Sequence, residues 1–188
     1  GNDLARGLEL SADPMENLVR ILDSKELIRM DLGCISWDDG ESKKFFAVSS
    51  GVGVDADVCR LALSSTLKKV LNKIGLGKLT YAILTLQSLF AMPTMNAHIV
   101  ADGVDHGIYD KILFMAFMNH RCEGGGVPMA PIADAFDGKI SMTMIHGLTK
   151  LGALGAFPSL LAAKHMTNKA YLGIDFKEAD IVLKTPFV

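Results

Sequence analysis

A change in hydrophobic periodicity at Pro93 constrains the fold more than any other feature of the sequence. Upstream of it, residues 55–75 and 76–92 carry apolar side chains at helical spacing, and downstream of it apolar residues recur with a period close to two. A period of two is typical of strands that bury one face. The sequence therefore predicts a helix at 148–165 and strands at 27–37, 43–54, 95–103, 111–120, 139–147, 169–176 and 179–188.

This mixture of elements favours one fold class. Two or three helices with about seven short strands indicate a β-rich α+β fold, with two packed sheets and helical insertions. The chain has 188 residues, of which 49% are hydrophobic, so it can bury a sizeable core. Its length predicts one domain, or one domain plus a piece of another.

Charge, cysteine content and hydropathy exclude several classes of protein. The formal net charge of -2, from 19 basic and 21 acidic residues, gives no basic field for nucleic acid. The odd number and wide spacing of Cys34, Cys59 and Cys122 argue against a disulfide framework or a zinc site, and fit a reduced, cytoplasmic setting. No run of about 18 apolar residues predicts a membrane span. Because the chain begins at GNDLARGL without an initiator Met, we expect it to be part of a longer protein.

The first segment, GNDLARGL, combines an Asn–Asp pair with the start of a short helix. Free N–H groups at a helix start attract anions, and an acid there can hold the Mg²⁺ that accompanies phosphates. Asn2 and Asp3 are therefore candidates for a phosphate site, although an ordinary helix cap is the simpler explanation. A second helix is predicted from Asp13, where Pro14 suits the first helical position and Glu16 completes a capping box.

Two further candidates lie at apolar strands. Asp31, in MDLG, falls inside the predicted strand 27–37, and a buried carboxylate is costly unless it is paired or bound to a metal. A strand-end acid that faces solvent is the alternative. In SSGVGVDADV, Gly51 and Gly53 allow the backbone to approach a ligand closely beside Asp55. A strand-to-helix turn with Asp55 as its N-cap is the alternative there.

The segment EGGGVPMAPIADAFDGKIS, residues 123–141, joins three glycines to two prolines and two further acids. The glycines permit close approach of the backbone to a ligand or to another strand. The turn around Asp134 and Asp137 can offer a carboxylate and main-chain carbonyls to a hard cation. A turn that merely reverses the chain is the alternative.

The order of these motifs is more specific than any one of them. Over essentially the whole chain, GNDLARGL, MDLG, FAVSSGVGVDADV, GLGKLTYAI and GGGVPMAPIADAFDGKI resemble the diacylglycerol-kinase-type lipid kinases of bacteria, to which the sphingosine and ceramide kinases are related. The resemblance implies an α/β nucleotide-binding domain and a C-terminal β-sandwich domain. It assigns residues 1–25 to a remnant of the nucleotide-binding domain, and residues 26–188 to the β-sandwich domain, incomplete at its C-terminus.

The same resemblance assigns roles to single residues. Asn2 and Asp3 match a pair near the nucleotide phosphates, and Asp3 and Asp31 match acids that are linked through water to catalytic Mg²⁺. Asp55 falls where related sphingosine kinases place an acid at the lipid head group. Substrate contacts are therefore expected from Gly51, Gly53 and Asp55.

A structural Mg²⁺ site is also implied, at the turn ADAFDGK. Its expected ligands are the Asp137 side chain and the main-chain carbonyls of Asp134 and Lys139. The backbone oxygen is indifferent to the side chain, so the lysine at this position is no obstacle.

The implied activity is that of an ATP-dependent lipid kinase, which transfers the γ-phosphate of ATP to the hydroxyl of a lipid such as diacylglycerol, with Mg²⁺ as cofactor. Two parts of the family pattern are absent from the chain: the GGDGT loop, and the general-base segment, which is expected beyond Val188. The chain by itself is therefore expected to be inactive. A non-catalytic lipid- or nucleotide-binding module and an NAD-kinase-like enzyme are the alternatives. The expected setting is the cytoplasm with peripheral membrane contact, without nucleic acid, and a homodimer is compatible with it.

Overall fold

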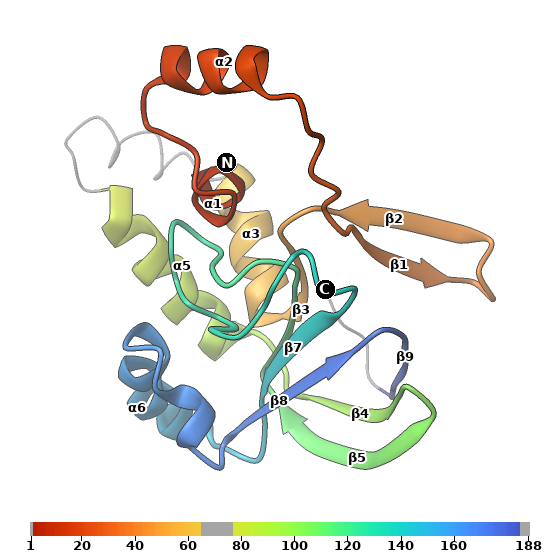
Figure 1. Ribbon diagram of the computed structural model, residues 1–188. Helices are drawn as coiled ribbons and strands as arrows, with labels where there is room; N and C mark the ends of the chain where they lie inside the picture. The colour runs from red at the N-terminus through yellow and green to blue at the C-terminus, as the bar shows by residue number, and fades with distance from the viewer. Residues whose placement is uncertain (1, 65–76, 185–188) are drawn as a thin grey trace.

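Figure 1 shows the computed structural model of the protein, in which residues 2–64 and 77–184 are described. Its helices are α1 (Asn2–Gly7), α2 (Pro14–Asp23), α3 (Val54–Ser64), α5 (Gly77–Ala91), α6 (Lys150–Leu161) and the 3-10 helix η1 (His165–Thr167). Its strands are β1 (Gly33–Trp37), β2 (Ser42–Phe46), β3 (Ser49–Gly53), β4 (Met95–Ala101), β5 (Val104–Ile112), β6 (Phe114–Met118), β7 (Ile140–Ile145), β8 (Tyr171–Phe176) and β9 (Ala179–Leu183).

Two antiparallel sheets form the body of the fold, as the sequence predicts. One sheet has four strands in the order β3-β6-β7-β8, and the other has three in the order β5-β4-β9. Buried side chains of both sheets share one hydrophobic cluster, in which Met95 and Ile99 of β4 meet Met115 of β6 and Met144 of β7. The sheets therefore pack as a sandwich, and the methionines of these strands are core residues.

The other face of the four-stranded sheet is covered by helices. Phe114 and Ala116 of β6 share a second cluster with Leu89 of α5 and Ala156 of α6, while the intervening Met115 belongs to the sandwich core. Successive residues of β6 thus alternate between two apolar layers, which explains why the strand is hydrophobic throughout. The result is three layers, in which α3, α5 and α6 flank the four-stranded sheet opposite the three-stranded one (Figure 1).

The structure corrects two predicted strands near the N-terminus. The run 27–37 is a strand only from Gly33, so Asp31 lies two residues before β1 rather than inside it. The run 43–54 divides into β2 and β3, because the carbonyls of Ala47 and Val48 between them accept hydrogen bonds from Asn119 instead of from a strand.

One strand was predicted only at its last two residues, Lys111 and Ile112. The sequence VDHGIYDKI forms β5, which pairs with β4 along one edge of the three-stranded sheet. Its polar residues and glycine conceal it, because an edge strand needs few buried side chains. The predicted strand 111–120 therefore combines the end of β5 with β6, and Leu113 lies between them.

The predicted helices are confirmed within the described residues. The run 55–75 corresponds to α3, and its residues from 65 onward lie outside the described part of the chain. At α2, the Asp13 carboxylate accepts a hydrogen bond from Met15 N at 2.9 Å, and Pro14 begins the helix. The capping box was wrong in one respect: the Glu16 carboxylate accepts a hydrogen bond from the hydroxyl of Ser11.

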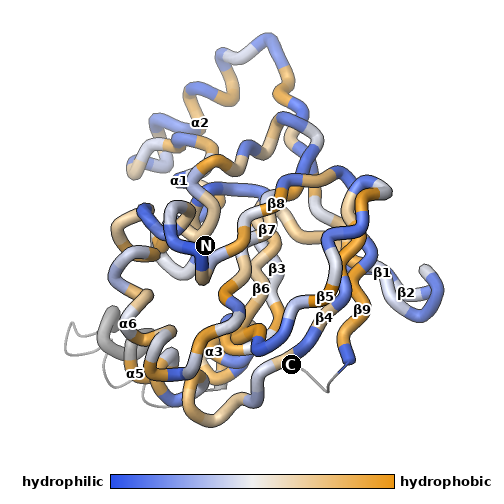
Figure 2. Tube along the Cα trace, turned by 90° about the horizontal axis from the view of Figure 1, so that it is seen from below, coloured by the Kyte–Doolittle hydropathy of each residue, from blue (hydrophilic) through white to orange (hydrophobic). Residues whose placement is uncertain are grey.

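The α2 helix stands apart from the two sheets. Hydrophilic and hydrophobic residues alternate along it in Figure 2, and none of its residues is buried. Within the described residues, no helix combines the length and the apolar content that crossing a membrane requires.

Candidate functional site

The three glycines after Glu123 form a tight loop at the centre of the candidate site. Glu123 and Val127 pair with each other through N–H···O distances of 3.0 and 2.8 Å. Between them the chain turns with positive φ at each glycine, including +90° at Gly125, a conformation that other residues adopt at a cost. The N–H of Gly126 stays inside the loop, where it donates to Glu123 O at 3.1 Å, whereas the N–H of Gly125 is reached by a side chain from another element.

The side chain that reaches Gly125 is the carboxylate of Asp3. Its Oδ2 accepts a hydrogen bond from Gly125 N at 2.9 Å, and its Oδ1 accepts one from the guanidinium of Arg6. Gly126 lies against the same guanidinium, because a Cβ at this position would come within 3.1 Å of Arg6 Cζ. Helix α1 is thereby attached to the glycine loop. Asn2 begins α1, and its side chain lies outside the described part of the structure.

A second acid, Asp55, faces the loop from the start of α3. Its side chain folds back over β3, and its Oδ2 lies 2.0 Å from the position that a Cβ would take at residue 51. Gly51 therefore leaves the space that the carboxylate occupies, as a close-approach glycine should. Gly53 has a different role, because it is buried against the backbone carbonyl of Leu113 in the core.

Asp55 and Glu123 form a half-buried pair of carboxyl groups. Burial raises the pKa of Asp55, and burial together with the negative charge of Asp55 raises the pKa of Glu123 to about 8. Glu123 is therefore the partner that keeps a proton near neutral pH, and it donates a hydrogen bond to Asp55. Within the described chain, its Oε1 is buried without a hydrogen-bond partner, as suits a neutral acid better than a carboxylate.

Asp31 lies at a different place, beside the predicted Mg²⁺ turn. Its Oδ2 accepts a hydrogen bond from Gly138 N at 2.7 Å, and its backbone N–H donates to Ala135 O at 2.8 Å. The amide of Asn119, at the end of β6, donates to the carbonyl of Asp31 at 2.8 Å and to that of Ala47 at 2.9 Å. Asp31 is thus half-buried and fixed on both sides.

The turn itself is exposed and offers oxygen atoms. The Asp134 carboxylate accepts from Phe136 N at 3.1 Å, and the Asp137 carboxylate accepts from Lys139 N at 2.9 Å through one oxygen. The main-chain carbonyl of Asp134 takes only a long bond, of 3.5 Å, from Asp137 N. A carboxylate oxygen and main-chain carbonyls on one short turn are ligands that suit Mg²⁺, so the residues present fit the predicted ion.

The acids of the site do not form a ready-made cage for a metal. Among the described residues there is no group of three or more His, Cys, Asp or Glu side chains placed to hold one. The structure brings Asp3 to the glycine loop and Asp31 to the turn, and the water-linked Mg²⁺ role of these two acids stays a prediction.

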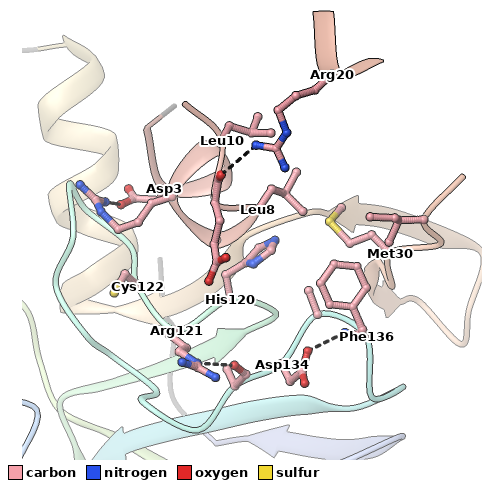
Figure 3. A pocket seen from close by; sticks show the side chains of 16 residues that line it. Asp3, Leu8, Leu10, Arg20, Met30, His120, Arg121, Cys122, Asp134 and Phe136 are labelled. Carbon is pink, nitrogen blue, oxygen red and sulfur yellow. Dashed lines mark hydrogen bonds and ion pairs between the residues drawn. The ribbon is translucent and has the colours of Figure 1, made fainter. Parts of the chain in front are cut away.

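A cavity of about 1040 Å³ opens between α1, the segment before β1 and the loop after β6. Figure 3 shows His120 and Leu8 near its centre, with Asp3 on one side and Met30 and Phe136 on the other. Burial lowers the pKa of His120, against the opposing charge of Asp134, and its Nε2 is buried without a partner among the described residues. The cavity is also lined by the cations Arg6, Arg20 and Arg121.

Two residues of the site were not predicted from the sequence. The sequence predicts a glycine loop that begins at Glu123, but it assigns no role to the Glu123 side chain. The signal was that a loop of three glycines does not require an acid before it. Asn119 ends an otherwise apolar strand, FMAFMN, and is fully buried. A buried amide in such a place needs several hydrogen-bond partners, and this was the available signal.

Comparison with known proteins places the chain in a family. Residues 47–181 match the family model described as "YegS C-terminal NAD kinase beta sandwich-like domain". Two curated relatives, named diacylglycerol kinase in two strains of Mycobacterium tuberculosis, are 28% identical over 168 residues. The match covers 88% of this chain and 51% of each relative, so the chain spans about half the length of the curated relatives it matches.

Solved structures agree on the fold. A candidate diacylglycerol kinase from Bacillus anthracis strain Sterne superposes with a TM-score of 0.65 at 17% identity, covering 98% of this chain and 56% of that one. A diacylglycerol kinase from the same strain gives a TM-score of 0.56 at 13% identity, covering 98% and 53%. The chain therefore belongs to the family of the YegS C-terminal NAD kinase beta sandwich-like domain, and the curated relatives that it resembles are named diacylglycerol kinase.

Proposed function

We propose that this chain is the lipid-binding part of an ATP-dependent lipid kinase, which transfers the γ-phosphate of ATP to the hydroxyl of diacylglycerol or a similar lipid. One observation carries the proposal: the glycine loop 123–127 is bound to Asp3 on one side and faces Asp55 on the other. The loop joins an acid expected near the nucleotide phosphates to an acid expected near the lipid head group. Two reactants in a phosphoryl transfer have to meet at such a junction.

The cavity beside Asp3 supports the nucleotide side of the proposal. Guanidinium groups match the geometry of phosphate oxygens, and Arg6, Arg20 and Arg121 all line this space. Arg6 is already oriented by its ion pair with Asp3. These side chains would hold the anionic chain of ATP close to the glycine loop.

The Asp55–Glu123 pair supports the lipid side. The single proton of a neutral Glu123 is donated to Asp55, so the pair keeps several acceptor oxygens in a half-buried corner. A lipid hydroxyl can donate to such an oxygen, so this pair suits the head group of a neutral lipid. The residues would bind and orient the hydroxyl for attack.

Mg²⁺, when bound, supplies neutralisation of the charge on the phosphate oxygens. Asp3 and Asp31 are the side chains proposed to act on it through water. Asp137, with the carbonyls of Asp134 and Lys139, is proposed to hold a second, structural ion. We propose that this second ion stiffens the turn to which Asp31 is bonded.

Transfer of radiolabelled phosphate from ATP to lipid tests the proposal. The 188-residue chain and the longest native form that contains it would each be incubated with ATP, Mg²⁺ and vesicles carrying diacylglycerol, ceramide or phosphatidylglycerol. We expect labelled lipid from the longer form, and its loss on Asp3→Asn or Asp31→Asn. Binding of lipid or nucleotide by the longer form, without transfer to any acceptor, would instead favour the non-catalytic module.

A further inference from the structure

The helical layer has an unusual distribution of charge. All 21 Asp and Glu residues lie outside the stretches 58–101 and 138–174, although these stretches contain nine of the 19 Lys and Arg residues. Helices α5 and α6 come from these two stretches. The small net charge of the chain therefore conceals two helices of this layer, α5 and α6, that carry no acid, whereas the acids of the layer, Asp55 and Asp57, lie on α3.

Both helices also present apolar side chains to solvent. On α6, Leu151, Leu154 and Leu161 are exposed, whereas Ala153, Ala156 and Leu160 on the opposite side are buried in the core. The exposed leucines are three and seven residues apart, which places them on one face of the helix. A helix that is apolar on both sides is normally covered on both sides.

Helix α5 repeats this pattern. Ile83, Leu86 and Phe90 are exposed at a spacing of three and four residues, which also places them on one helix face, and Leu89 faces the core. The two helices are neighbours, because Lys150 Nζ at the start of α6 donates a hydrogen bond to Phe90 O near the end of α5 at 2.7 Å. We call the surface made by the exposed residues the α5–α6 face, defined by Ile83, Leu86, Phe90, Leu151, Leu154 and Leu161.

Two exposed lysines follow α6 in the sequence. Lys164 and Lys169 follow α6 closely, on either side of η1, and both are exposed. Apolar side chains with lysines at their edge are what a helix shows when it lies in the interface of an anionic bilayer.

We propose that the α5–α6 face docks on an anionic lipid bilayer, with its apolar residues inserted between the head groups and Lys164 and Lys169 paired with their negative charges. The choice of a bilayer rests on the proposed function, in which the substrate is a lipid. A second copy of the chain fits this face less well, because an isologous contact would bring the same lysines towards each other.

Helix α2 is the competing apolar surface, since Leu18 and Leu22 are also exposed. Its surroundings differ in charge. The segment 9–26 holds five acids, Glu9, Asp13, Glu16, Asp23 and Glu26, against two cations, Arg20 and Lys25. An anionic surface would repel this segment and attract the α5–α6 face.

Sedimentation with vesicles tests the proposal, using the 188-residue chain and no ATP. We expect binding to vesicles of phosphatidylcholine mixed with phosphatidylglycerol, little binding to phosphatidylcholine alone, and weakening by salt. Lys164→Gln and Lys169→Gln should each reduce the partition coefficient by about fivefold. Leu151→Ser with Leu154→Ser should reduce it by on the order of tenfold or more.

Matched controls keep the result specific. Lys177→Gln, which removes an exposed lysine in the turn between β8 and β9, and Leu18→Ser with Leu22→Ser in α2 should leave binding unchanged. Thermal unfolding of each variant verifies that it folds. Three results would overturn the proposal: equal binding to neutral and anionic vesicles, full binding by the α6 variants, or loss of binding in the α2 variant alone.

The oligomeric state gives a further outcome. If light scattering shows a dimer that Leu151→Ser with Leu154→Ser converts to a monomer while vesicle binding persists, the face belongs to a second copy and the proposal fails. Because the vesicle assay measures no turnover, its failure is distinguishable from failure of the kinase assay.

Discussion

The carboxylate of Asp31 accepts a hydrogen bond from Gly138 N across 107 residues of sequence, with 2.7 Å between Oδ2 and the nitrogen. The backbone of Asp31 also donates to Ala135 O in the same turn. An acid expected to act on one Mg²⁺ is thus bonded to the turn expected to hold another. The position of the Asp31 carboxylate should therefore depend on whether the turn around Asp134 and Asp137 is ordered.

Substitution of Asp31 separates its structural and chemical roles. Asn keeps an oxygen that can accept from Gly138 N, so Asp31→Asn should change the unfolding free energy by less than about 1 kcal/mol, whereas Asp31→Ala leaves the N–H without its partner and should cost about 1–2 kcal/mol. Urea unfolding measures both values, and Asp39→Asn in the exposed hairpin turn is the control. Phosphate transfer by the longer form should vanish in both Asp31 variants. Wild-type turnover by Asp31→Asn would count against its role at the metal.

Removal of the structural ion should be visible without any substrate. Mg²⁺ should raise the Tm of the wild-type chain, because a ligand that binds the folded state alone stabilises it. Asp137→Ala should abolish this rise and leave Tm unchanged in the presence of a chelator. Differential scanning calorimetry measures both, with the exposed Asp180→Ala as the matched control. An undiminished response to Mg²⁺ in Asp137→Ala excludes the predicted ligand set.

The raised pKa of Glu123 predicts a pH dependence of stability. An unfolded Glu ionises near 4.5, whereas folded Glu123 holds its proton until about pH 8, so the folded state binds more protons between these values. Stability should therefore be highest at the acid end of this window and fall as pH rises through it, by up to about 5 kcal/mol. Glu123→Gln should flatten the dependence, since the amide can donate to Asp55 at every pH.

The measurement is urea unfolding at several pH values, taken as the difference between the variant and the wild type. Glu178→Gln, at an exposed turn, is the control and should follow the wild-type curve. A Glu123→Gln curve that runs parallel to the wild type would show that Glu123 is ionised throughout.

Gly51→Ala tests the corner that holds Asp55. Because the new Cβ would meet Asp55 Oδ2 at 2.0 Å, the carboxylate has to move away from Glu123. We expect a loss of about 1–2 kcal/mol in unfolding free energy and a weaker pH dependence than the wild type shows. Gly155→Ala in α6 is the control: nothing lies within 4 Å of its added Cβ, and alanine favours a helix. Equal stability of the two variants would contradict the packing described here.

Asn119→Ala should be among the more costly substitutions in the chain. It deletes two hydrogen bonds, to the carbonyls of Asp31 and Ala47, at a fully buried position. An expected loss of about 2–4 kcal/mol follows from leaving these groups without partners. Asn168→Ala, whose side chain accepts one exposed bond from Ala170 N, should cost under about 1 kcal/mol in the same unfolding assay.

The fold could be predicted from the sequence where the burial of one strand face makes apolar residues recur at every second position. In β4, the alternation of buried Met95, Ala97, Ile99 and Ala101 follows the sequence directly, and a two-sheet fold follows from several such runs. Most of strand β5 was missed because it lies at an edge, where hydrogen bonds to β4 rather than apolar burial define it. Such pairing depends on a partner distant in sequence, which local patterns do not reveal.

The acidic residues of the site could be predicted from the sequence, but the residues that each of them contacts could not. Asp3, Asp31, Asp55 and Asp137 were found as single residues, yet their contacts run to Gly125, Gly138, Glu123 and Lys139, and three of these four contacts join segments far apart in the chain. A raised pKa such as that of Glu123 arises from burial and from a neighbouring charge, and both exist only after folding.

The methionine-rich interior of the sandwich has a consequence for oxidative damage. Met95, Met115, Met142 and Met144 are each at most 1% exposed, whereas Met15 is 63% exposed on α2. Peroxide should therefore convert Met15 to its sulfoxide first and leave the interior thioethers intact while the sheets stay together. Sulfoxides at the interior positions would therefore indicate that the two sheets separate transiently and expose these methionines to peroxide.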